Sequence, residues 1–441
     1  MQRNLVVFGL GISATALLNF AKQKDDLNVI ASDDNKARID ELKKQFKDVD
    51  NISFATIDDI NFDKIDLIIC APGISEKNKI FQIANLKKIK ITCDIELMQQ
   101  FCQDSKFIGI TGTNGKSTIS ALTNHILTEN NIKSQLGGNI GNAVFNLNLD
   151  GKNSNFVLEV SSFQLDLIEE TYFNISVISN ITPDHLDRHG NMENYIAAKK
   201  RVFLNSHEND FLILNIDDEN CLKIYQELKD VNIKLITVSV KNDLVKINFD
   251  DQVLENNLKN SDYLQGKHNL YNIAIAYVIG KIFDLKNQNI YDAIASFKGL
   301  KHRLQLVSQD SNIAFINDSK ATNATSCVVA LKSFDNIYLI LGGVAKDGGI
   351  KEIIPHLDKV KHVFLIGQAS DQFAQGLEGR VEYFKCQNLE NAFNKATKIA
   401  ENDPNLVNIL LSPACSSFDQ WPNFEKRGEF FCQLVTNYVK K

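Results

Sequence analysis

The stretch "GITGTNGKST", residues 109–118, decides the architecture of this chain, because it joins a short apolar run to a helical pattern. Gly112 and Gly115 would let backbone amides approach phosphate oxygens. Lys116 would add a positive charge, and Ser117 could ligate Mg²⁺ at the start of the helix. The stretch therefore predicts a strand, a phosphate-binding loop and a helix.

The match to the phosphate-loop pattern is imperfect, because Ile110 stands where G-x-x-x-x-G-K-[ST] has glycine. The alternative is a glycine-rich turn with a solvated lysine, but the flanking strand and helix patterns favour nucleotide binding. The predicted ATP-contacting residues of this loop are Gly112, Thr113, Asn114, Gly115, Lys116, Ser117 and Thr118.

Similar apolar runs recur on both sides of the loop, among them "NLVVFG", "NFVLEVS", "DFLILNID" and "NIYLILGG". Each is short, ends in a polar or glycine residue and alternates with a helical pattern, which predicts an α/β fold with parallel sheets. With 441 residues the chain exceeds one hydrophobic core. We expect a Rossmann-like domain over 1–93, a central P-loop-type ATPase domain over 94–299 and a Rossmann-like domain over 300–441.

A second nucleotide-type loop, "VVFGLGISA", opens the chain at residues 6–14. Gly9 and Gly11 follow a predicted strand, and Asp33 follows the next strand about 20 residues later, which suits a ribose. On these residues alone, a dinucleotide-dependent oxidoreductase remains an alternative.

Polar residues follow two strands near the central loop. Glu159 lies inside an otherwise apolar run, where a lone carboxylate is unfavourable unless it is paired or binds metal. For Glu159 and His185 we favour magnesium ligation or phosphate contact, whereas ordinary loop polarity explains Asp187 and His189 equally well.

The helical stretch "NMENYIAAKKRVF" places a lysine on an apolar stripe. Met192, Ile196, Lys199 and Phe203 are spaced by four, three and four residues, so Lys199 faces inward and Lys200 elsewhere. Such a lysine either extends its amine to solvent, loses its charge or is modified.

The bulk composition restricts the partners. The net charge of −6 is spread without long like-charge runs, which argues against nucleic acid or an anionic membrane. The eight cysteines show no C-x-x-C pair, as expected for free thiols in a reducing compartment. The apolar start is too short to span a bilayer, so we expect a cytoplasmic monomer.

Nine ordered motifs between residues 112 and 428 resemble the Mur ligases, the ATP-dependent amide-forming synthetases of peptidoglycan assembly. They are "GTNGKST", "EVSSFQLD", "NITPDHLDRH", "AAKKRVF", "GKHNLYNIAIA", "KHRLQ", "NDSKATN", "LGGVAKDGG" and "LSPACSSFDQWPNFEKRG". "SSFQL" and the last motif are similar to those of the D-glutamate-adding members. The resemblance implies UDP-N-acetylmuramoyl-L-alanine and D-glutamate as substrates, ATP and two Mg²⁺ ions as cofactors, and an acyl-phosphate intermediate.

The resemblance also implies roles for single residues. Beyond the loop, the ATP contacts are Asn269, Asn272, Arg303 and Asp318, so the last domain would close over the nucleotide. The UDP-substrate residues are Gly9, Gly11, Asp33, Gly73, Asn139 and His185. The amino-acid residues are Lys320, Thr322, Lys346, Ser417 and Phe424. The metal ligands are Ser117 and Glu159 for one ion, and His185 and a carbamylated Lys199 for the other. The catalytic set is Lys116, His185, Lys199 and Lys320.

Two departures and two alternatives accompany this interpretation, and the first alternative is another Mur ligase with a different amino-acid specificity. "GLGISATA" lacks a glycine often found after the first serine, and Ala71 replaces a frequent serine, so the fine contacts of the nucleotide-sugar site are open. A nucleotide hydrolase without ligation would share the phosphate loop, but it would not need Lys320, Lys346 and Ser417.

Overall fold

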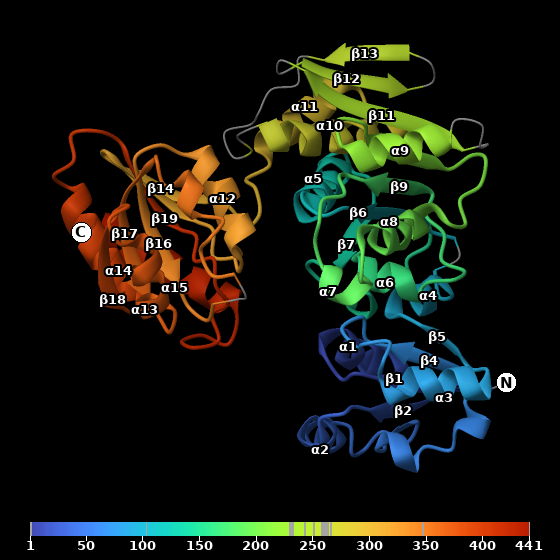
Figure 1. Cartoon of the computed structure of the whole chain (residues 1–441). Coiled ribbons are helices and arrows are strands. Elements are labelled where there is room, and N and C mark those ends of the chain that lie inside the picture. Colours follow the sequence, from blue (N-terminus) through green and yellow to red (C-terminus); the bar gives the residue numbers. More distant parts are fainter. Residues whose placement is uncertain are drawn as a thin grey trace. The chain divides into compact units, whose positions relative to one another are not determined.

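The computed structural model describes residues 2–102, 104–228, 233–241, 244–249, 252–256, 264, 267–345 and 348–440, without the side chains of 252–256 and 267. These residues form two compact units: Leu264 and the residues after Phe297 belong to the second, and all others belong to the first. The first unit contains two sheets and the second contains one (Figure 1).

The first sheet is parallel, with the strand order β3-β2-β1-β4-β5. Its order reverses between β1 and β4, and ligands of such sheets bind beyond the strand ends at that point. The loop after β1 contains Gly9 and Gly11, and the turn after β4 contains Gly73. The elements are β1 (Arg3–Phe8), α1 (Ile12–Ala21), β2 (Leu27–Ser32), α2 (Lys36–Gln45), β3 (Ile52–Phe54), η1 (Ile57–Asp59), η2 (Phe62–Lys64), β4 (Leu67–Cys70), α3 (Lys79–Lys87), β5 (Lys90–Thr92) and α4 (Asp94–Gln99).

The central sheet has the order β13-β12-β11-β10-β9-β6-β8-β7, and its strands are parallel from β7 to β11. Here the order reverses between β6 and β9. The strands are β6 (Lys106–Thr111), β7 (Ser134–Gly138), β8 (Asn155–Glu159), β9 (Ile175–Ile178), β10 (Phe211–Asn215), β11 (Lys234–Lys241), β12 (Leu244–Phe249) and β13 (Gln252–Asn256). The helices are α5 (Lys116–Glu129), η3 (Val144–Asn146), α6 (Ser162–Leu167), α7 (Leu186–His189), α8 (Met192–Lys200), η4 (Arg201–Phe203), α9 (Glu219–Glu227), α10 (Lys267–Ile282) and α11 (Asn287–Ser296).

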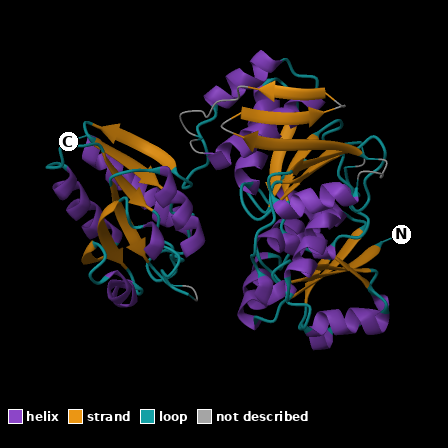
Figure 2. Cartoon of the chain, turned by 45° about the horizontal axis from the view of Figure 1, so that its top comes forward, coloured by secondary structure: helices purple, strands orange, loops and turns teal. Residues whose placement is uncertain are grey.

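The sheet of the second unit has the order β14-β15-β19-β16-β17-β18, and helices cover both of its faces (Figure 2). Along β16, Leu339 and Leu341 pack on one face while Tyr338 and Ile340 pack on the other, as the strand period of two requires. The elements are β14 (Gln305–Asp310), β15 (Ile313–Asn317), α12 (Ala324–Ser333), β16 (Ile337–Gly342), η5 (Ile354–His356), β17 (Val360–Ile366), α13 (Ser370–Leu377), β18 (Glu382–Gln387), α14 (Leu389–Ala400), β19 (Val407–Leu411) and α15 (Phe424–Val439).

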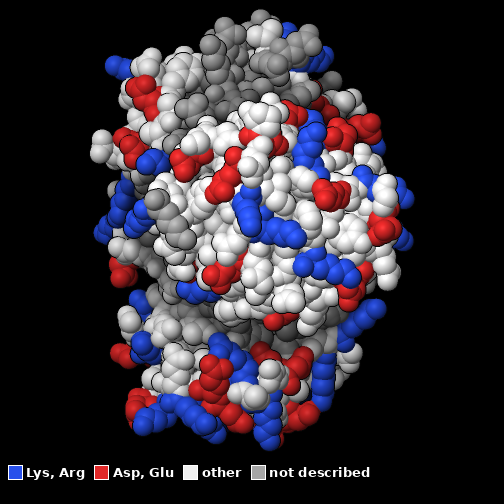
Figure 3. Space-filling model, turned by 90° about the vertical axis from the view of Figure 1, so that its left-hand side faces the viewer, with Lys and Arg blue, Asp and Glu red and all other residues white. Residues whose placement is uncertain are grey.

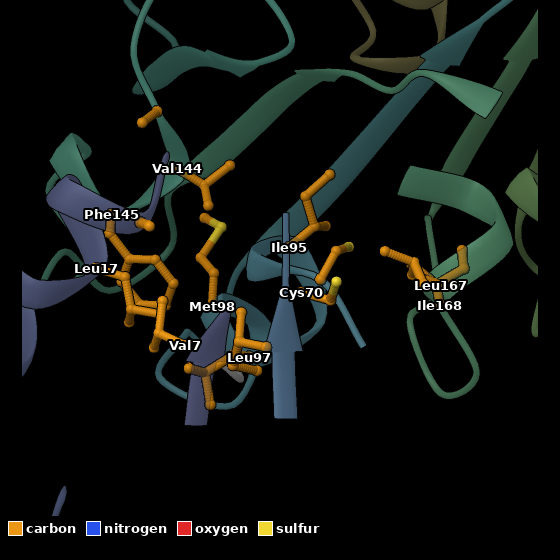
Figure 4. Packing of buried hydrophobic residues seen from close by; sticks show 14 of the residues in the cluster. Val7, Leu17, Cys70, Ile95, Leu97, Met98, Val144, Phe145, Leu167 and Ile168 are labelled. Carbon is orange, nitrogen blue, oxygen red and sulfur yellow. The ribbon is translucent and has the colours of Figure 1, made fainter. Parts of the chain in front are cut away.

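The first two sheets share one hydrophobic core. Figure 4 shows Met98 of α4 among Leu17 of α1 and Val144 and Phe145 of η3. A polar contact joins the same regions, since Glu96 Oε2 accepts three successive backbone N–H groups of residues 169–171. The two sheets are therefore parts of one packed unit.

The predicted fold class is confirmed, and the runs expected to be strands are strands. One feature was missed: β12 and β13 add an antiparallel extension to the parallel central sheet, and β14 pairs antiparallel with β15. All eight cysteines are free, as predicted.

Charge and hydropathy give two further observations. Lys and Arg side chains lie interspersed with Asp and Glu over the face drawn in Figure 3. None of the helices in the described ranges combines the length and the apolar character that a membrane crossing requires.

Candidate active site

The central loop needs its glycines for steric reasons. Gly112 has a φ of 148°, and a side chain there would overlap Ser179. Gly115 has a φ of 84°, and a side chain there would overlap the amide of Asn272. Only glycine adopts these conformations without strain, so the backbone requires glycine at both positions.

The residues after β9 hold the loop in place. Asn114 N donates to Asn180 Oδ1 at 2.9 Å, and Ser179 Oγ donates to the carbonyl of Asn114 at 2.8 Å. Thr113 Oγ1 donates to the carbonyl of Thr182 at 3.0 Å. Because β6 and β9 are neighbours, the segments that follow them meet at one edge of the sheet.

Two lysines converge on a single carbonyl of the loop. Lys116 Nζ donates to the carbonyls of Gly112 and Thr113 at 2.9 and 2.8 Å, and Lys199 Nζ donates to the same Gly112 carbonyl at 2.8 Å. Burial, and then the charge of Lys116, hold the pKa of Lys199 well below its usual value. The Lys199 amine lies 4.6 Å from the ring centre of Tyr195.

This burial decides one alternative for Lys199. Its relative exposure is 1%, so the side chain does not extend to solvent. Lys200 points elsewhere, as predicted, and its amine pairs with Glu227 at 2.6 Å. Loss of charge or modification remain the two interpretations of Lys199.

Glu159 ends β8 and pairs with Ile110 of β6, beside the loop. The carboxylate is buried; its Oε1 accepts from Asn139 Nδ2 at 2.8 Å, while Oε2 has no hydrogen-bond partner. Ser117 is also buried, at the start of α5. Helix α5 packs against β8. A buried carboxylate oxygen without a hydrogen-bond partner and a serine hydroxyl on these two elements fit Mg²⁺, which takes oxygen ligands and keeps several waters.

In the described part of the chain, no three His, Cys, Asp or Glu side chains form a metal-binding group. A magnesium ion at this loop would therefore use the serine hydroxyl, phosphate oxygens and water in addition to Glu159.

The side chain of His185 contacts Asp184 and Phe163. The residue precedes α7 with a φ of 52°, its side chain is half exposed, and its Nε2 is 3.4 Å from Asp184 Oδ2. Its ring packs against Phe163 at 4.9 Å. Asp187 is exposed and His189 is buried, so these two neighbours differ in environment.

Helix α10 supplies both predicted asparagines. Asn272 Nδ2 donates to Asn269 Oδ1 at 2.9 Å, and both side chains are buried. Asn272 faces Gly115, so the structure brings these asparagines to the phosphate loop.

The N-terminal loop is built differently. Gly9 has a φ of 88° and lies against Ala71, whereas nothing lies within 4 Å of the Cβ positions of Gly11 and Gly73. The loop amide of Leu10 donates to Asp33 Oδ2 at 2.5 Å. Arg38 Nε donates to the carbonyl of Leu10 at 2.8 Å, a contact that the sequence did not indicate.

The second unit brings several predicted residues together. Asp318 follows β15, and burial raises its pKa to about 7, although it accepts a hydrogen bond from Ser412 Oγ at 2.8 Å. Lys320 Nζ lies 5.6 Å from the ring centre of Phe424, and Ser417 is buried.

Three other predicted site residues are Arg303, Thr322 and Lys346. Arg303 lies near Asp318, since its charge acts on that carboxyl. Thr322 N donates to the carbonyl of Lys320 at 2.8 Å. Lys346 lies outside the described residues.

Three family descriptions match this chain. The description "Mur ligase MurD-like, N-terminal domain" matches residues 3–93, "Mur ligase middle domain" matches 110–280, and "Mur ligase, glutamate ligase domain" matches 302–415. A protein of Rickettsia prowazekii named UDP-N-acetylmuramoylalanine--D-glutamate ligase is 41% identical, and the alignment covers 98% of each chain. Proteins of the same name from Paramagnetospirillum magneticum and Wolbachia pipientis are 37% and 35% identical, over 98% and 99% of this chain and 96% and 97% of theirs.

The chain belongs to the Mur ligase family. The family predicted from the motifs is thereby confirmed. Solved structures agree on the fold: MurF ligase from Thermotoga maritima, crystallised in complex with ADP, has a TM-score of 0.60 at 14% identity, with 99% of this chain and 98% of that chain covered. The UDP-N-acetylmuramate-alanine ligase MurC from the same organism has a TM-score of 0.57 at 16% identity, with 99% of both chains covered.

Some site residues of this Mur ligase were not identified from the sequence. Ser179, Asn180 and Thr182 hold the phosphate loop, and Tyr195 lies under the buried lysine. The available signal was position, because the first three directly follow the strand that neighbours β6.

Proposed function

We propose that this Mur ligase uses ATP to join D-glutamate to UDP-N-acetylmuramoyl-L-alanine through an acyl phosphate, in peptidoglycan synthesis. The observation that best supports the chemistry is the loop where Lys116 and Lys199 meet at one carbonyl beside the buried Glu159. The full-length relatives named for D-glutamate ligation support the substrates.

In the proposed reaction the loop amides and Lys116 bind the phosphates of ATP. Lys116 then exchanges its carbonyl partners for phosphate oxygens and offsets the charge that develops on the transferring phosphoryl group. We assign Asn269 and Asn272, together with Arg303 and Asp318 of the second unit, to the nucleotide.

We assign Ser117 and Glu159 to one Mg²⁺ ion, and His185 with a carbamylated Lys199 to a second. The ions would neutralise phosphate and carboxylate charge as the two anionic groups approach. Carbamylation requires an amine lone pair, and the lowered pKa of Lys199 favours the unprotonated amine that carries one. The modified group would be an oxygen ligand where the unmodified amine is a poor one.

The two substrates would bind at separate places. We assign Gly9, Gly11, Asp33 and Gly73 to the UDP moiety, and Asn139 and His185 to the muramoyl-alanine part. We assign Lys320, Thr322, Lys346, Ser417 and Phe424 to D-glutamate, whose two carboxylates need cationic and hydroxyl partners.

We also propose that residues 1–93, 94–299 and 300–441 act as three domains of a cytoplasmic monomer that needs neither nucleic acid nor a membrane. Sedimentation of the purified chain, with and without substrates, tests the monomer.

The function is tested by phosphate release from ATP with Mg²⁺, UDP-N-acetylmuramoyl-L-alanine and D-glutamate, with the amide product identified by mass spectrometry. We expect release only when all components are present. Turnover with L-lysine, diaminopimelate or L-glutamate but not with D-glutamate would show that the substrate is wrong. Hydrolysis that is independent of any amino acid would favour a nucleotide hydrolase instead.

A further inference from the structure

A buried histidine that the proposed mechanism does not use lies between the elements that present the proposed metal ligands. The side chain of His189 is 4% exposed, and each of its ring nitrogens faces a side chain of α6. Nε2 is 3.0 Å from Ser162 Oγ, and Nδ1 is 3.5 Å from Asp166 Oδ2. Ser162 and Asp166 are four residues apart, so one face of α6 holds both edges of the ring.

The surroundings favour one tautomer of the ring. The Asp166 carboxylate opposite Nδ1 favours the proton on Nδ1, and Nε2 then accepts the hydrogen bond from the Ser162 hydroxyl. The ring is also packed between Phe163 at 5.5 Å and Tyr195 at 5.2 Å. Polar side chains therefore contact both ring nitrogens, and two aromatic rings pack against the ring.

The elements that meet at this ring are those that present Glu159, His185 and Lys199. Ser162 begins α6 only three residues after Glu159, and the amide of His189 donates to the carbonyl of His185 at 3.0 Å across the single turn of α7. Tyr195, against which His189 packs, lies on α8 beneath the amine of Lys199.

We propose that His189 is a positioning residue that fixes the end of β8, the start of α7 and helix α8 relative to one another, and thereby sets the geometry of the metal ligands. The proposal rests on the proposed function, because it takes Glu159, His185 and Lys199 as the ligands. Residues that orient metal ligands typically change metal affinity by about 10- to 100-fold when they are replaced.

The test measures metal binding directly, with Mn²⁺ titrated into the full chain in the presence of ADP and free Mn²⁺ read by electron paramagnetic resonance. We expect His189→Ala to weaken Mn²⁺ binding about 10-fold. His189→Gln places an amide near the Nε2 position and is expected to restore binding to within about threefold of the wild type. Ser162→Ala removes one hydroxyl and serves if His189→Ala does not fold; it is expected to weaken binding in the same direction.

Asn51→Ala is the matched control. Asn51 Nδ2 donates to the carbonyls of Ala21, Lys24 and Leu27, at the edge of the first sheet opposite its ligand loops. We expect this variant to unfold at a lower denaturant concentration and to bind Mn²⁺ like the wild type.

The outcomes separate the two proposals. If His189→Ala loses stability as Asn51→Ala does and binds Mn²⁺ with wild-type affinity, the role of His189 is only structural and the proposal fails. If the wild type binds Mn²⁺ but forms no amide from D-glutamate, the proposed function fails, and Mn²⁺ binding by His189→Ala alone decides whether His189 positions the metal ligands. A wild-type chain that binds no Mn²⁺ contradicts both.

Discussion

The two glycine loops of the first unit occupy the same place in their sheets but differ in construction. Around the central loop, neighbouring side chains fill the space beside Gly112 and Gly115, and two lysine amines donate hydrogen bonds to carbonyls of the loop. In the N-terminal loop only Gly9 is enclosed, the space beside Gly11 is open, and Asp33 binds the loop amide. The first construction suits a closely held anionic phosphate, and the second leaves one side free for a larger ligand.

The largest expected effect tests the charge of the central loop. Lys116→Ala should lower the rate of amide formation by about 10³-fold, because the transferring phosphoryl group loses a cationic partner. Lys200→Ala is the matched control, since its salt bridge with Glu227 is partly exposed. If the two variants form the amide at rates within twofold of each other, Lys116 has no special role in phosphoryl transfer.

Glycine replacement tests the steric contrast between the loops. Gly112→Ala should lower the free energy of unfolding by about 2–3 kcal/mol, since the new side chain overlaps Ser179 in a strained backbone conformation. Gly11→Ala should lower it by less than about 1 kcal/mol, which is the loss expected at a helix N-cap. Urea unfolding of both variants measures the difference, and equal losses would refute the contrast.

The next prediction concerns Asp33, whose carboxylate binds the N-terminal loop. Asp33→Asn weakens the hydrogen bond to the amide of Leu10, and we expect the KM for the nucleotide sugar to rise about tenfold, equivalent to about 1.4 kcal/mol. The KM for ATP should stay unchanged. Asp34→Asn, at the exposed neighbouring position, is the control; a tenfold rise for this variant as well would mean that net charge alone is responsible.

The smallest effect concerns pH. Burial raises the pKa of Asp94, which lines a small cavity with Gly9, and burial lowers the pKa of Lys199 at the other loop. The folded state thus binds more protons at Asp94 than the unfolded state does, and fewer at Lys199. The contribution of Asp94 to the free energy of unfolding should therefore fall as the pH rises. The contribution of Lys199 should rise with pH.

Asp94→Asn should therefore stabilise the chain by about 1 kcal/mol at pH 8, with the gain vanishing near pH 4. Lys199→Met in bicarbonate-free buffer should show a gain that is larger at pH 7 than at pH 10. The free energies of unfolding of both variants and the wild type are measured across this pH range. Stabilisation that changes with pH in the same direction in both variants would contradict the prediction.

Local pattern was sufficient for much of this architecture. Buried parallel strands appear as short apolar runs, and the helical spacing placed Lys199 correctly on the inward-facing stripe, although it left open whether the amine reaches solvent. The antiparallel strands β12 and β13 follow β11 without such a run, so they were missed.

Long-range contacts explain the rest of the difference. The enclosure of Gly115 by Asn272 joins residues that are far apart in the chain, and no local spacing encodes it. His189 was judged as compatible with ordinary loop polarity as with function, because its partners Ser162 and Asp166 lie on another helix.

The contact between Gly115 and Asn272 has a consequence for the order of synthesis. A ribosome makes the phosphate loop early, but the helix that closes it, α10, emerges only after the whole central sheet. Until then the nascent chain has an incomplete nucleotide pocket and an uncovered face of α5, against which α10 and α11 later pack. Folding of the first unit during translation should therefore finish only when residue 297 has left the exit tunnel. A truncated fragment that stops before α10 should need a chaperone to stay in solution.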